Sequence, residues 1–513
     1  MRCQPPAQPC SNSFAAEYQA ILKQANAFRD EFAQLLTAAG DAYTQTEAAV
    51  SGALADPAPT PVAVSLIMDG SGYPVPPLQY INEVYSLYIA PNFTTSNIQA
   101  LTTPEQLYPL TGVKSPLLNP SVSQGVTILN DAILQAYQAG TTPINVFGFS
   151  QSAVISSLEM PKLVAAGIPS SAVNFVLIGD PMNPNGGVLA RFPGLSIPSL
   201  GATFFGGTPA NDYPTAIYTG EYDGYADFPR YPIDLLADLN ALVGIVPVHG
   251  GYPTFTPAQV MSATVLPTSG PTMTTYYMIP TPNLPLLDPV RAIPYLGSPL
   301  ADLLQPDLTY LVNWGYGDPA HGYSTGPANV TTPFGFLPPL SATTALGPDL
   351  ISGTQQGIAA AAGDFHAQGL PSLPARSLAG ISNAFTSGPS TAPGTQAPVM
   401  PAPSTIDGII SGLQTANTHL VGDFTNALWT AYSSLLPAAD IVNAGVTVVP
   451  AYDVNLFLDG IEQALDGDPG AGLVNAIGNP IAADTALVSL GGLLEFFVLF
   501  GATYSIAGDF TNL

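Results

Sequence analysis

The sequence contains few basic residues and few charged residues of any kind. Nine Lys and Arg residues stand against 35 Asp and Glu residues over 513 positions, which gives a formal net charge of −26, and only 9% of the residues are charged. Binding to nucleic-acid phosphates requires clustered cations, so this composition excludes a nucleic-acid partner. An acidic surface rich in neutral residues suits a protein of the cell envelope or the extracellular space.

Cysteine and histidine are also scarce. Both cysteines, Cys3 and Cys10, lie in the first ten residues, so no disulfide can cross-link the rest of the fold. The sequence contains neither a cluster of Cys and His with metal-ligand spacing nor a Walker-type phosphate loop. We therefore expect the protein to need no metal and no cofactor.

Proline and glycine are abundant, at 54 and 49 residues, and they indicate many loops and turns. The length allows about two to four domains of typical size. We expect a helical segment at 1–50, a Pro/Ala linker at 51–61, a main domain at 62–330, an extension at 331–385, a Pro/Ser/Thr-rich linker at 386–405 and an apolar, mostly helical region at 406–513.

The most informative stretch is INVFGFSQSAVISS at residues 144–157. A strand-like apolar run precedes Ser150, and a helix-like run with an apolar face follows it. A serine at a sharp turn between strand and helix, with small residues two positions before and after it, has the pattern of a nucleophile elbow. Gly148 meets this requirement, and Ser152 stands where the usual pattern has glycine. The pattern predicts Ser150 as a nucleophile.

Other strand-like runs, at 62–68, 173–178 and 215–219, each end in a loop that contains glycine and aspartate. The repeated order of strand, loop, helix and strand predicts an α/β fold with a mainly parallel sheet flanked by helices. Ligands bind at the carboxyl ends of the strands in such sheets. The loops after these runs should therefore gather around Ser150.

A serine hydroxyl becomes an effective nucleophile when a histidine takes its proton and a carboxylate orients the imidazole. His249 is the candidate base because its glycine-rich loop, residues 246–252, follows a helix-like run and has the freedom to reach over the sheet edge. His321, between two glycines, is the runner-up. His366 and His419 lie near or beyond a linker and are expected at the surface.

Asp223 is the candidate acid because it follows a strand through a glycine-containing turn. Asp227 and Asp180 stay open as alternatives, since acids at the ends of neighbouring strands can also reach the imidazole. The oxyanion of an acyl-transfer reaction needs two backbone N–H donors. Gln151, directly after the nucleophile, would supply one, and Ser71 in the glycine loop 69–72 would supply the other.

Six segments follow one another in the order SLIMDGSGYPVPPLQYINEVYSLYIAPN, TPEQLYPLTG, INVFGFSQSA, VLIGDPMNPNGG, YDGYADFPRYP and VHGGY. Together they resemble the PE-PPE domain, a serine α/β-hydrolase domain related to cutinases, over about residues 62–330. The resemblance implies an α/β-hydrolase-type fold and esterase, lipase or acyltransferase activity on fatty acyl substrates. It also implies a triad of Ser150, an aspartate in YDGYAD and His249.

Residues 13–49 have a helical pattern whose apolar stripe needs a partner helix or the main domain to cover it. The segment YQAILKQANAFRDEFAQLLTAAGDAYTQTEAA resembles the second helix of the mycobacterial PE domain, without the first helix and the Pro-Glu opening. In that family Tyr-x-x-x-Asp/Glu is part of the type VII secretion signal, which implies this role for Tyr43 and Glu47. The amino terminus lacks the basic region and apolar core of a secretory signal peptide. We therefore expect secretion or an envelope location by the type VII route.

Two later segments have alternative interpretations. The Pro-rich run at 275–299 would form either a lid over an acyl site or an irregular packing extension. The run LVSLGGLLEFFVLFGATY at 487–504 is near the lower length limit for a membrane helix. Its glycine pair and its one charged residue, Glu495, favour a buried or membrane-surface helix.

These features predict a serine esterase or lipase that hydrolyses fatty acyl esters through an acyl-enzyme. An acyltransferase that moves the acyl group to a sugar or lipid hydroxyl shares the same first half-reaction and stays open. So does a non-catalytic surface protein that uses the hydrolase fold as a scaffold. The substrate would be an acyl ester or a lipid.

Overall fold

The computed structural model describes residues 63–95, 97–368 and 406–511. The chain divides into two compact units, Met1–Pro61 and Val62–Leu513, and all described residues belong to the second. The predictions for the amino-terminal helix, Tyr43, Glu47, Cys3 and Cys10 and for the two linkers lie outside the described residues.

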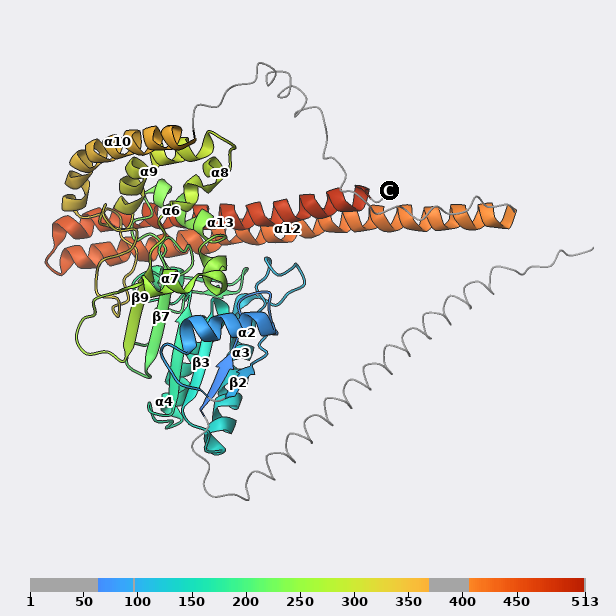
Figure 1. The fold of residues 1–513 in the computed structure, drawn as a ribbon, viewed down its shortest axis with the longest axis horizontal. Coiled ribbons are helices and arrows are strands. Elements are labelled where there is room, and N and C mark those ends of the chain that lie inside the picture. The colour runs from blue at the N-terminus through green and yellow to red at the C-terminus, as the bar shows by residue number, and fades with distance from the viewer. Residues whose placement is uncertain (1–62, 96, 369–405, 512–513) are drawn as a thin grey trace, which may run out of the picture. The chain divides into compact units, whose positions relative to one another are not determined.

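A seven-stranded sheet forms the centre of the second unit (Figure 1), in the order β2-β1-β3-β4-β7-β9-β8. Every neighbouring pair is parallel except β8 and β9. The strands are β1 (Val64–Ile67), β2 (Asn97–Ala100), β3 (Ile144–Phe149), β4 (Val173–Ile178), β7 (Thr215–Gly220), β8 (Thr264–Val265) and β9 (Thr274–Ile279). A separate ribbon pairs β5 (Ser196–Ile197) with β6 (Ala202–Thr203). The mainly parallel α/β fold predicted from the sequence is confirmed.

Both faces of the sheet are covered, because its central strands are apolar on both sides. On one face Val146, Phe175 and Ile217 belong to a buried core with side chains of α3 (Leu118–Gln138) and α4 (Gln151–Ala165). On the other face Phe147, Val176 and Ala216 belong to a second core. That core includes side chains of α2 (Leu78–Val84), the π-helical turn η1 (Tyr85–Ile89), the 3-10 turn η2 (His249–Thr254) and α7 (Pro257–Met261).

A third buried cluster lies beside the sheet. It joins Tyr222 to side chains of α6 (Leu235–Gly244), η3 (Pro285–Leu287) and α9 (Gly297–Trp314). The remaining helices of this part are α5 (Val188–Arg191), α8 (Asp288–Arg291) and α10 (Leu340–Gln368), and α10 packs along α9.

The run at 275–299, interpreted from the sequence as either a lid or an irregular packing extension, begins with a strand. Residues 274–279 form β9, which pairs with β7 and β8 inside the sheet, and Tyr276 is buried. Of the prolines that follow, Pro285 lies in η3, which packs against α6, and Pro289 lies in α8, which packs against α9. The strand-forming residues of TTYYMI make this segment a strand, and the prolines that follow only end it.

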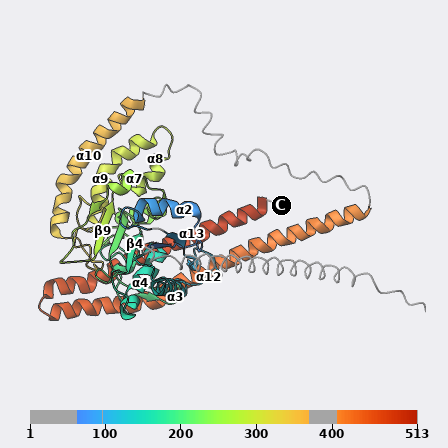
Figure 2. The same cartoon turned by 60° about the horizontal axis from the view of Figure 1, so that its bottom comes forward.

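The helices α12 (Ile406–Leu465) and α13 (Pro469–Thr511) form an antiparallel hairpin and lie side by side in both views (Figures 1 and 2). Side chains of both helices, including Ala444, Tyr452 and Ala483, belong to the same buried core as α3 and α4. The Tyr108 hydroxyl donates to Oδ2 of Asp440 at 2.7 Å, and Ser199 Oγ donates to the Asp440 carbonyl at 2.9 Å. The hairpin is therefore part of the second unit.

By length and composition, both hairpin helices are apolar enough to cross a membrane. The segments are Phe424–Leu465, with a mean hydropathy of 1.4, and Pro469–Thr503, with 1.8. Only 17% and 6% of their most apolar windows are buried. Within the run at 487–504, Leu487, Leu490 and Leu493 pack against the core, whereas Phe496 and Phe500 are exposed.

Candidate active site

Ser150 lies in a strained turn between β3 and α4. Its backbone angles are φ 56° and ψ −114°, a combination that residues with a side chain rarely adopt. Strand and helix approach so closely here that a Cβ atom on Gly148 would lie 2.6 Å from the carbonyl oxygen of Ser152. Position 148 therefore requires glycine, and the turn has the geometry of a nucleophile elbow.

Ser152 is fully buried where the usual elbow has glycine. Its hydroxyl accepts a hydrogen bond from the Phe149 N–H at 2.8 Å and donates one to the Phe149 carbonyl at 3.0 Å. A buried hydroxyl is costly only when it lacks such partners. The departure from the usual pattern is thus accommodated inside the turn.

His249 lies between Ser150 and Asp223. Its Nε2 is 2.9 Å from Ser150 Oγ, and its Nδ1 is 2.9 Å from Oδ2 and 3.0 Å from Oδ1 of Asp223. An ionised carboxylate only accepts hydrogen bonds, so Asp223 favours the tautomer with hydrogen on Nδ1. Nε2 is then free to accept the serine proton, which is the arrangement that nucleophilic catalysis requires.

Asp223 is fully buried and has a full set of donors. Its Oδ1 accepts from the N–H groups of Tyr225 at 2.9 Å and Ala226 at 3.2 Å. Its Oδ2 accepts from the Tyr252 hydroxyl at 2.8 Å. These donors replace the water that the carboxylate loses on burial and fix its orientation toward His249.

Tyr252 links the acid to the sheet. Its hydroxyl accepts from the N–H of Gly220, the last residue of β7, at 2.6 Å while it donates to Asp223. Burial, followed by the charge of Asp223, raises the pKa of Tyr252 well above its usual value, so the hydroxyl stays protonated as a donor. The sequence interpretation did not identify Tyr252 as a site residue, although VHGGY contains it.

The two alternative acids have other partners. Asp180 accepts from the Met182 N–H at 2.9 Å and from Thr208 Oγ1 at 2.6 Å, and burial raises its pKa to about 6. Asp227 accepts from the Tyr222 N–H at 3.0 Å, and burial raises its pKa well above the usual value. Within the described residues, neither carboxylate has a hydrogen bond to His249.

The alternative base also has another partner. His321 pairs through Nδ1 with Oδ2 of Asp318 at 3.1 Å, and 42% of its side chain is exposed. The structure thus brings Ser150, Asp223 and His249 together, and it gives Asp180, Asp227 and His321 different contacts.

The two residues expected at the oxyanion are joined through their side chains. Gln151 Nε2 donates to Ser71 Oγ at 3.0 Å and to the Gln106 carbonyl at 2.9 Å. Its Oε1 accepts from Ser121 Oγ at 2.6 Å, and that same hydroxyl accepts from the Gln106 N–H at 2.9 Å. These bonds close a ring that holds the glycine loop against the start of α4.

The backbone around Ser150 is suited to the binding of an oxyanion, which requires unpaired N–H groups. As the first residue of α4, Gln151 has no intrahelical acceptor for its N–H group. A Cβ atom on Gly70 would lie 3.3 Å from Cβ of Ser150, so the glycine loop approaches Ser150 closely.

Aromatic rings surround the histidine. The Tyr225 ring lies edge-on to the His249 ring with centroids 4.8 Å apart, and the Phe149 ring lies 5.2 Å away. Burial, with a contribution from Asp223, raises the pKa of Tyr225 to about 12. In the part of the chain that the structure describes, no group of three or more His, Cys, Asp or Glu side chains could hold a metal ion.

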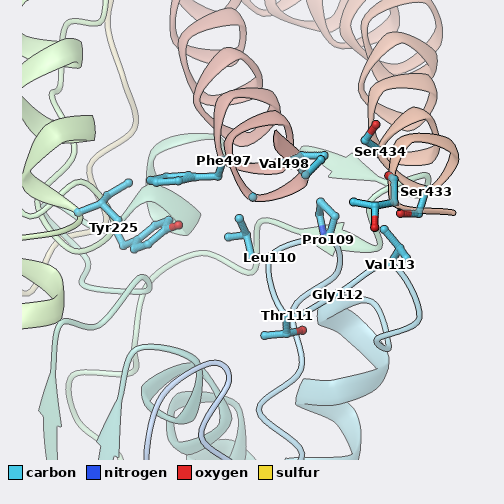
Figure 3. Close-up of a pocket in the computed structure, with 14 residues that line it drawn as sticks. Pro109, Leu110, Thr111, Gly112, Val113, Tyr225, Ser433, Ser434, Phe497 and Val498 are labelled. Atoms are coloured by element: carbon cyan, nitrogen blue, oxygen red, sulfur yellow. Dashed lines mark hydrogen bonds between the residues drawn. The ribbon is translucent and has the colours of Figure 1, made fainter. Parts of the chain in front are cut away.

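Two cavities adjoin Tyr225, with volumes of about 660 Å³ and about 720 Å³. They share Leu110, Tyr225, Ile245 and Phe497 as lining residues. In the smaller cavity Tyr225, Leu110 and Phe497 lie at one end, and Ser433 and Ser434 of α12 lie at the other (Figure 3). The Tyr225 ring, which lies next to the His249 ring, is therefore part of the wall of both cavities.

The fold and the elbow define an α/β-hydrolase-type protein, with Ser150 after β3, Asp223 after β7 and His249 on a later loop. The PE-PPE domain model matches residues 94–317, and the PE family model matches residues 7–50.

Three proteins of Mycobacterium tuberculosis illustrate the relationship. The uncharacterized PPE family protein PPE28 is 48% identical over 468 residues, which cover 91% of this chain and 69% of that protein. The esterase PE16 is 46% identical over 63% of this chain and 61% of that protein. The SL1278 acyltransferase Chp1 is 30% identical over 51% of this chain and 63% of that protein. The chain belongs to the PE-PPE domain family, as the six ordered motifs predicted.

Proposed function

We propose that this protein is a serine esterase that hydrolyses fatty acyl esters, with Ser150 as nucleophile, His249 as general base and acid, and Asp223 as the orienting carboxylate. The observation that carries the proposal is the pair of hydrogen bonds of His249, at 2.9 Å to Ser150 Oγ and 2.9 Å to Asp223 Oδ2. The similarity to the esterase PE16 supports the same reaction class.

In the first half-reaction, Ser150 Oγ forms a bond to the acyl carbon while its proton moves to His249 Nε2. The bond between the acyl carbon and the alcohol oxygen then breaks, and His249 returns the proton to the leaving alcohol. In the second half-reaction, water gives a proton to His249 Nε2 and its oxygen forms a bond to the acyl carbon. The bond between the acyl carbon and Ser150 Oγ then breaks, and His249 returns the proton to Oγ, which releases a fatty acid and restores the serine. The backbone N–H groups of Gln151 and Ser71 would stabilise the oxyanion in both steps.

Acyl transfer is the second candidate. The similarity to the acyltransferase Chp1 favours it, and so do the hydroxyl groups of Thr111, Thr430, Ser433 and Ser434 around the smaller cavity. A sugar or lipid hydroxyl would then replace water in the second half-reaction, with the same proton path. Incubation with an acyl ester and a hydroxyl acceptor separates the two, because mass spectrometry distinguishes free fatty acid from acylated acceptor.

The test of the enzyme proposal combines a fluorophosphonate probe with p-nitrophenyl esters. The wild type should label and turn over, and Ser150→Ala should do neither. His249→Ala and Asp223→Asn should lower kcat by about a thousandfold or more. The matched variants His321→Ala and Asp180→Asn should keep most of the activity. If the wild type neither labels nor exceeds Ser150→Ala, the protein is a non-catalytic member on a hydrolase scaffold.

We also propose that the protein reaches the cell envelope or the exterior by type VII secretion, with a helical partner for the amino-terminal segment. The similarity of residues 7–50 to the PE family supports this. Cell fractionation of a mycobacterial host that expresses the wild type or the double variant Tyr43→Ala/Glu47→Ala tests it. Equal export of the two proteins would contradict the proposal.

A further inference from the structure

The larger cavity lies between the catalytic part and the carboxyl-terminal hairpin. Its volume is about 720 Å³, within the range of sites that hold small molecules. One wall comes from residues that precede the hairpin in the chain, such as Leu107, Leu118 and Phe204. The opposite wall comes from α12 and α13, through residues such as Ile441 and Leu490. The hairpin is thus a structural wall of this cavity.

The lining of the cavity limits what can bind there. Most lining side chains are aliphatic or aromatic, and the charged ones, Asp484 and Glu495, are both acidic. A phosphate or a carboxylate would find no cation, and a sugar would leave its hydroxyl groups unpaired against apolar walls. A hydrocarbon chain meets neither penalty, because each buried methylene group gains from leaving water.

The position of the cavity connects it to the reaction. Tyr225 lines the cavity, and its ring lies 4.8 Å from the ring of His249. Leu107 also lines it and follows Gln106, whose carbonyl accepts from Gln151 directly after the nucleophile. An acyl chain that extends from Ser150 past Tyr225 would therefore reach this cavity.

We propose that this cavity holds the fatty acyl chain of the ester and of the acyl-enzyme, and that the α12–α13 hairpin forms its outer wall. The proposal rests on the proposed acyl-ester chemistry at Ser150 and adds a long-chain substrate class. It also gives the hairpin a role in chain-length selection. The hydrogen bonds of Asp440 to Tyr108 and Ser199 hold this wall in position.

Two hairpin glycines provide a sharp test. Gly445 of α12 and Gly491 of α13 both line the cavity. A Cβ atom on Gly445 would meet nothing within 4 Å, and one on Gly491 would meet only Ile441 Cγ2 at 3.5 Å. A side chain at either position therefore begins in open space without a backbone clash, and leucine favours the helix more than glycine does. Gly445→Leu and Gly491→Leu should therefore fold and reduce the space for the chain.

The matched control is Gly422→Leu, also in α12. A Cβ atom there meets nothing within 4 Å, and the residue lines neither cavity. With full-length protein, kcat/KM is measured for p-nitrophenyl butyrate and palmitate. We expect the palmitate-to-butyrate ratio to fall about tenfold to a hundredfold in Gly445→Leu and Gly491→Leu, as loss of room for two to four methylene groups predicts. The ratio should not change in Gly422→Leu.

A binding measurement keeps the test independent of turnover. In the Ser150→Ala background, the fluorescent methyl ester of cis-parinaric acid should bind, and either pocket variant should weaken its binding by about tenfold or more. Unchanged chain-length ratios and unchanged binding in both pocket variants would overturn the cavity proposal. Absence of wild-type turnover and labelling would instead overturn the esterase proposal, while the binding measurement still decides the role of the cavity.

Discussion

The hydroxyl of Tyr252 donates a hydrogen bond of 2.8 Å to Oδ2 of Asp223. The same hydroxyl accepts from the Gly220 N–H, so the acid is connected to the end of β7 through one side chain. Oδ2 is also 2.9 Å from His249 Nδ1. The orientation of the imidazole therefore depends on a residue that acts on it through Asp223.

Tyr252→Phe should lower kcat for ester hydrolysis by about tenfold or more and change KM little, because hydrogen bonds to charged groups contribute about 1.5–3 kcal/mol. Steady-state kinetics checks this. Tyr213→Phe is the matched control, since that buried hydroxyl donates only to the Ile168 carbonyl, at 2.9 Å. It should lose stability and keep kcat. Equal kcat values for both variants would show that Tyr252 is only a packing residue.

Ser152→Gly, which restores the usual elbow pattern, should destabilise the protein by about 1–2 kcal/mol. It removes the two hydrogen bonds with Phe149 and places glycine in the first turn of α4. Urea unfolding measures the stability, and probe labelling measures the nucleophile. We expect labelling within about threefold of the wild type. A large gain in labelling rate would mean that serine at this position impairs the elbow.

Glu105→Gln should stabilise the protein increasingly as the pH rises. Glu105 is fully buried, and this burial raises its pKa to about 8 from its usual value of 4.5. Between pH 4.5 and about 8 the native state keeps a proton that the unfolded chain releases. The stability that this proton contributes is therefore lost as the pH rises across this range. Glutamine does not titrate. Its advantage should grow by up to about 1.4 kcal/mol per pH unit across that window.

Urea unfolding at several pH values tests this, with Asp69→Asn for comparison. Burial raises the pKa of Asp69 to about 6, so the advantage of asparagine should stop growing near pH 6. A stability difference that does not depend on pH in either variant would contradict the assignment.

Arg191→Met should destabilise the protein by about 3 kcal/mol or more. The fully buried guanidinium donates to the carbonyl groups of Phe228, Thr332 and Asn185 and to Ser324 Oγ, at 2.7–3.2 Å. Methionine leaves these acceptors and the nearby Asp227 without the cation. Thermal unfolding against Arg291→Met, whose cation is partly exposed and pairs with Asp302, measures the difference. Comparable losses in the two variants would contradict this assignment.

The sequence predicts the central strands well because strands buried on both faces appear as continuous apolar runs, as in VNFVLI and INVFGF. The edge strand β2 has no such signal, since all four of its residues, Asn97–Ala100, are exposed. The strand β9 lies in a Pro-rich segment, which favoured a lid or loop interpretation. Here hydrogen bonding to β7 outweighs the composition.

The chain order of serine, aspartate and histidine left Asp180 and Asp227 open beside Asp223, and His321 open beside His249. The structure brings Ser150, Asp223 and His249 together. Their supporting contacts depend on distances that no local pattern encodes. Ser121 belongs to α3 and Gln151 to α4, and only packing brings Ser121 Oγ within 2.6 Å of Gln151 Oε1. Similarly, the apolar composition of 406–513 predicts helices, but it does not show that these helices pack into the same core as α3 and α4.

The hydrogen-bonded ring around Gln151 has a consequence for natural variation. The side chains of Ser71, Ser121 and Gln151 each complete a bond for another residue: loss of Ser71 removes one bond, loss of Ser121 removes two and loss of Gln151 removes three. These three positions should therefore change together among homologous sequences. Evolution of this loop would then proceed by coordinated replacement of the set, with single substitutions eliminated by selection.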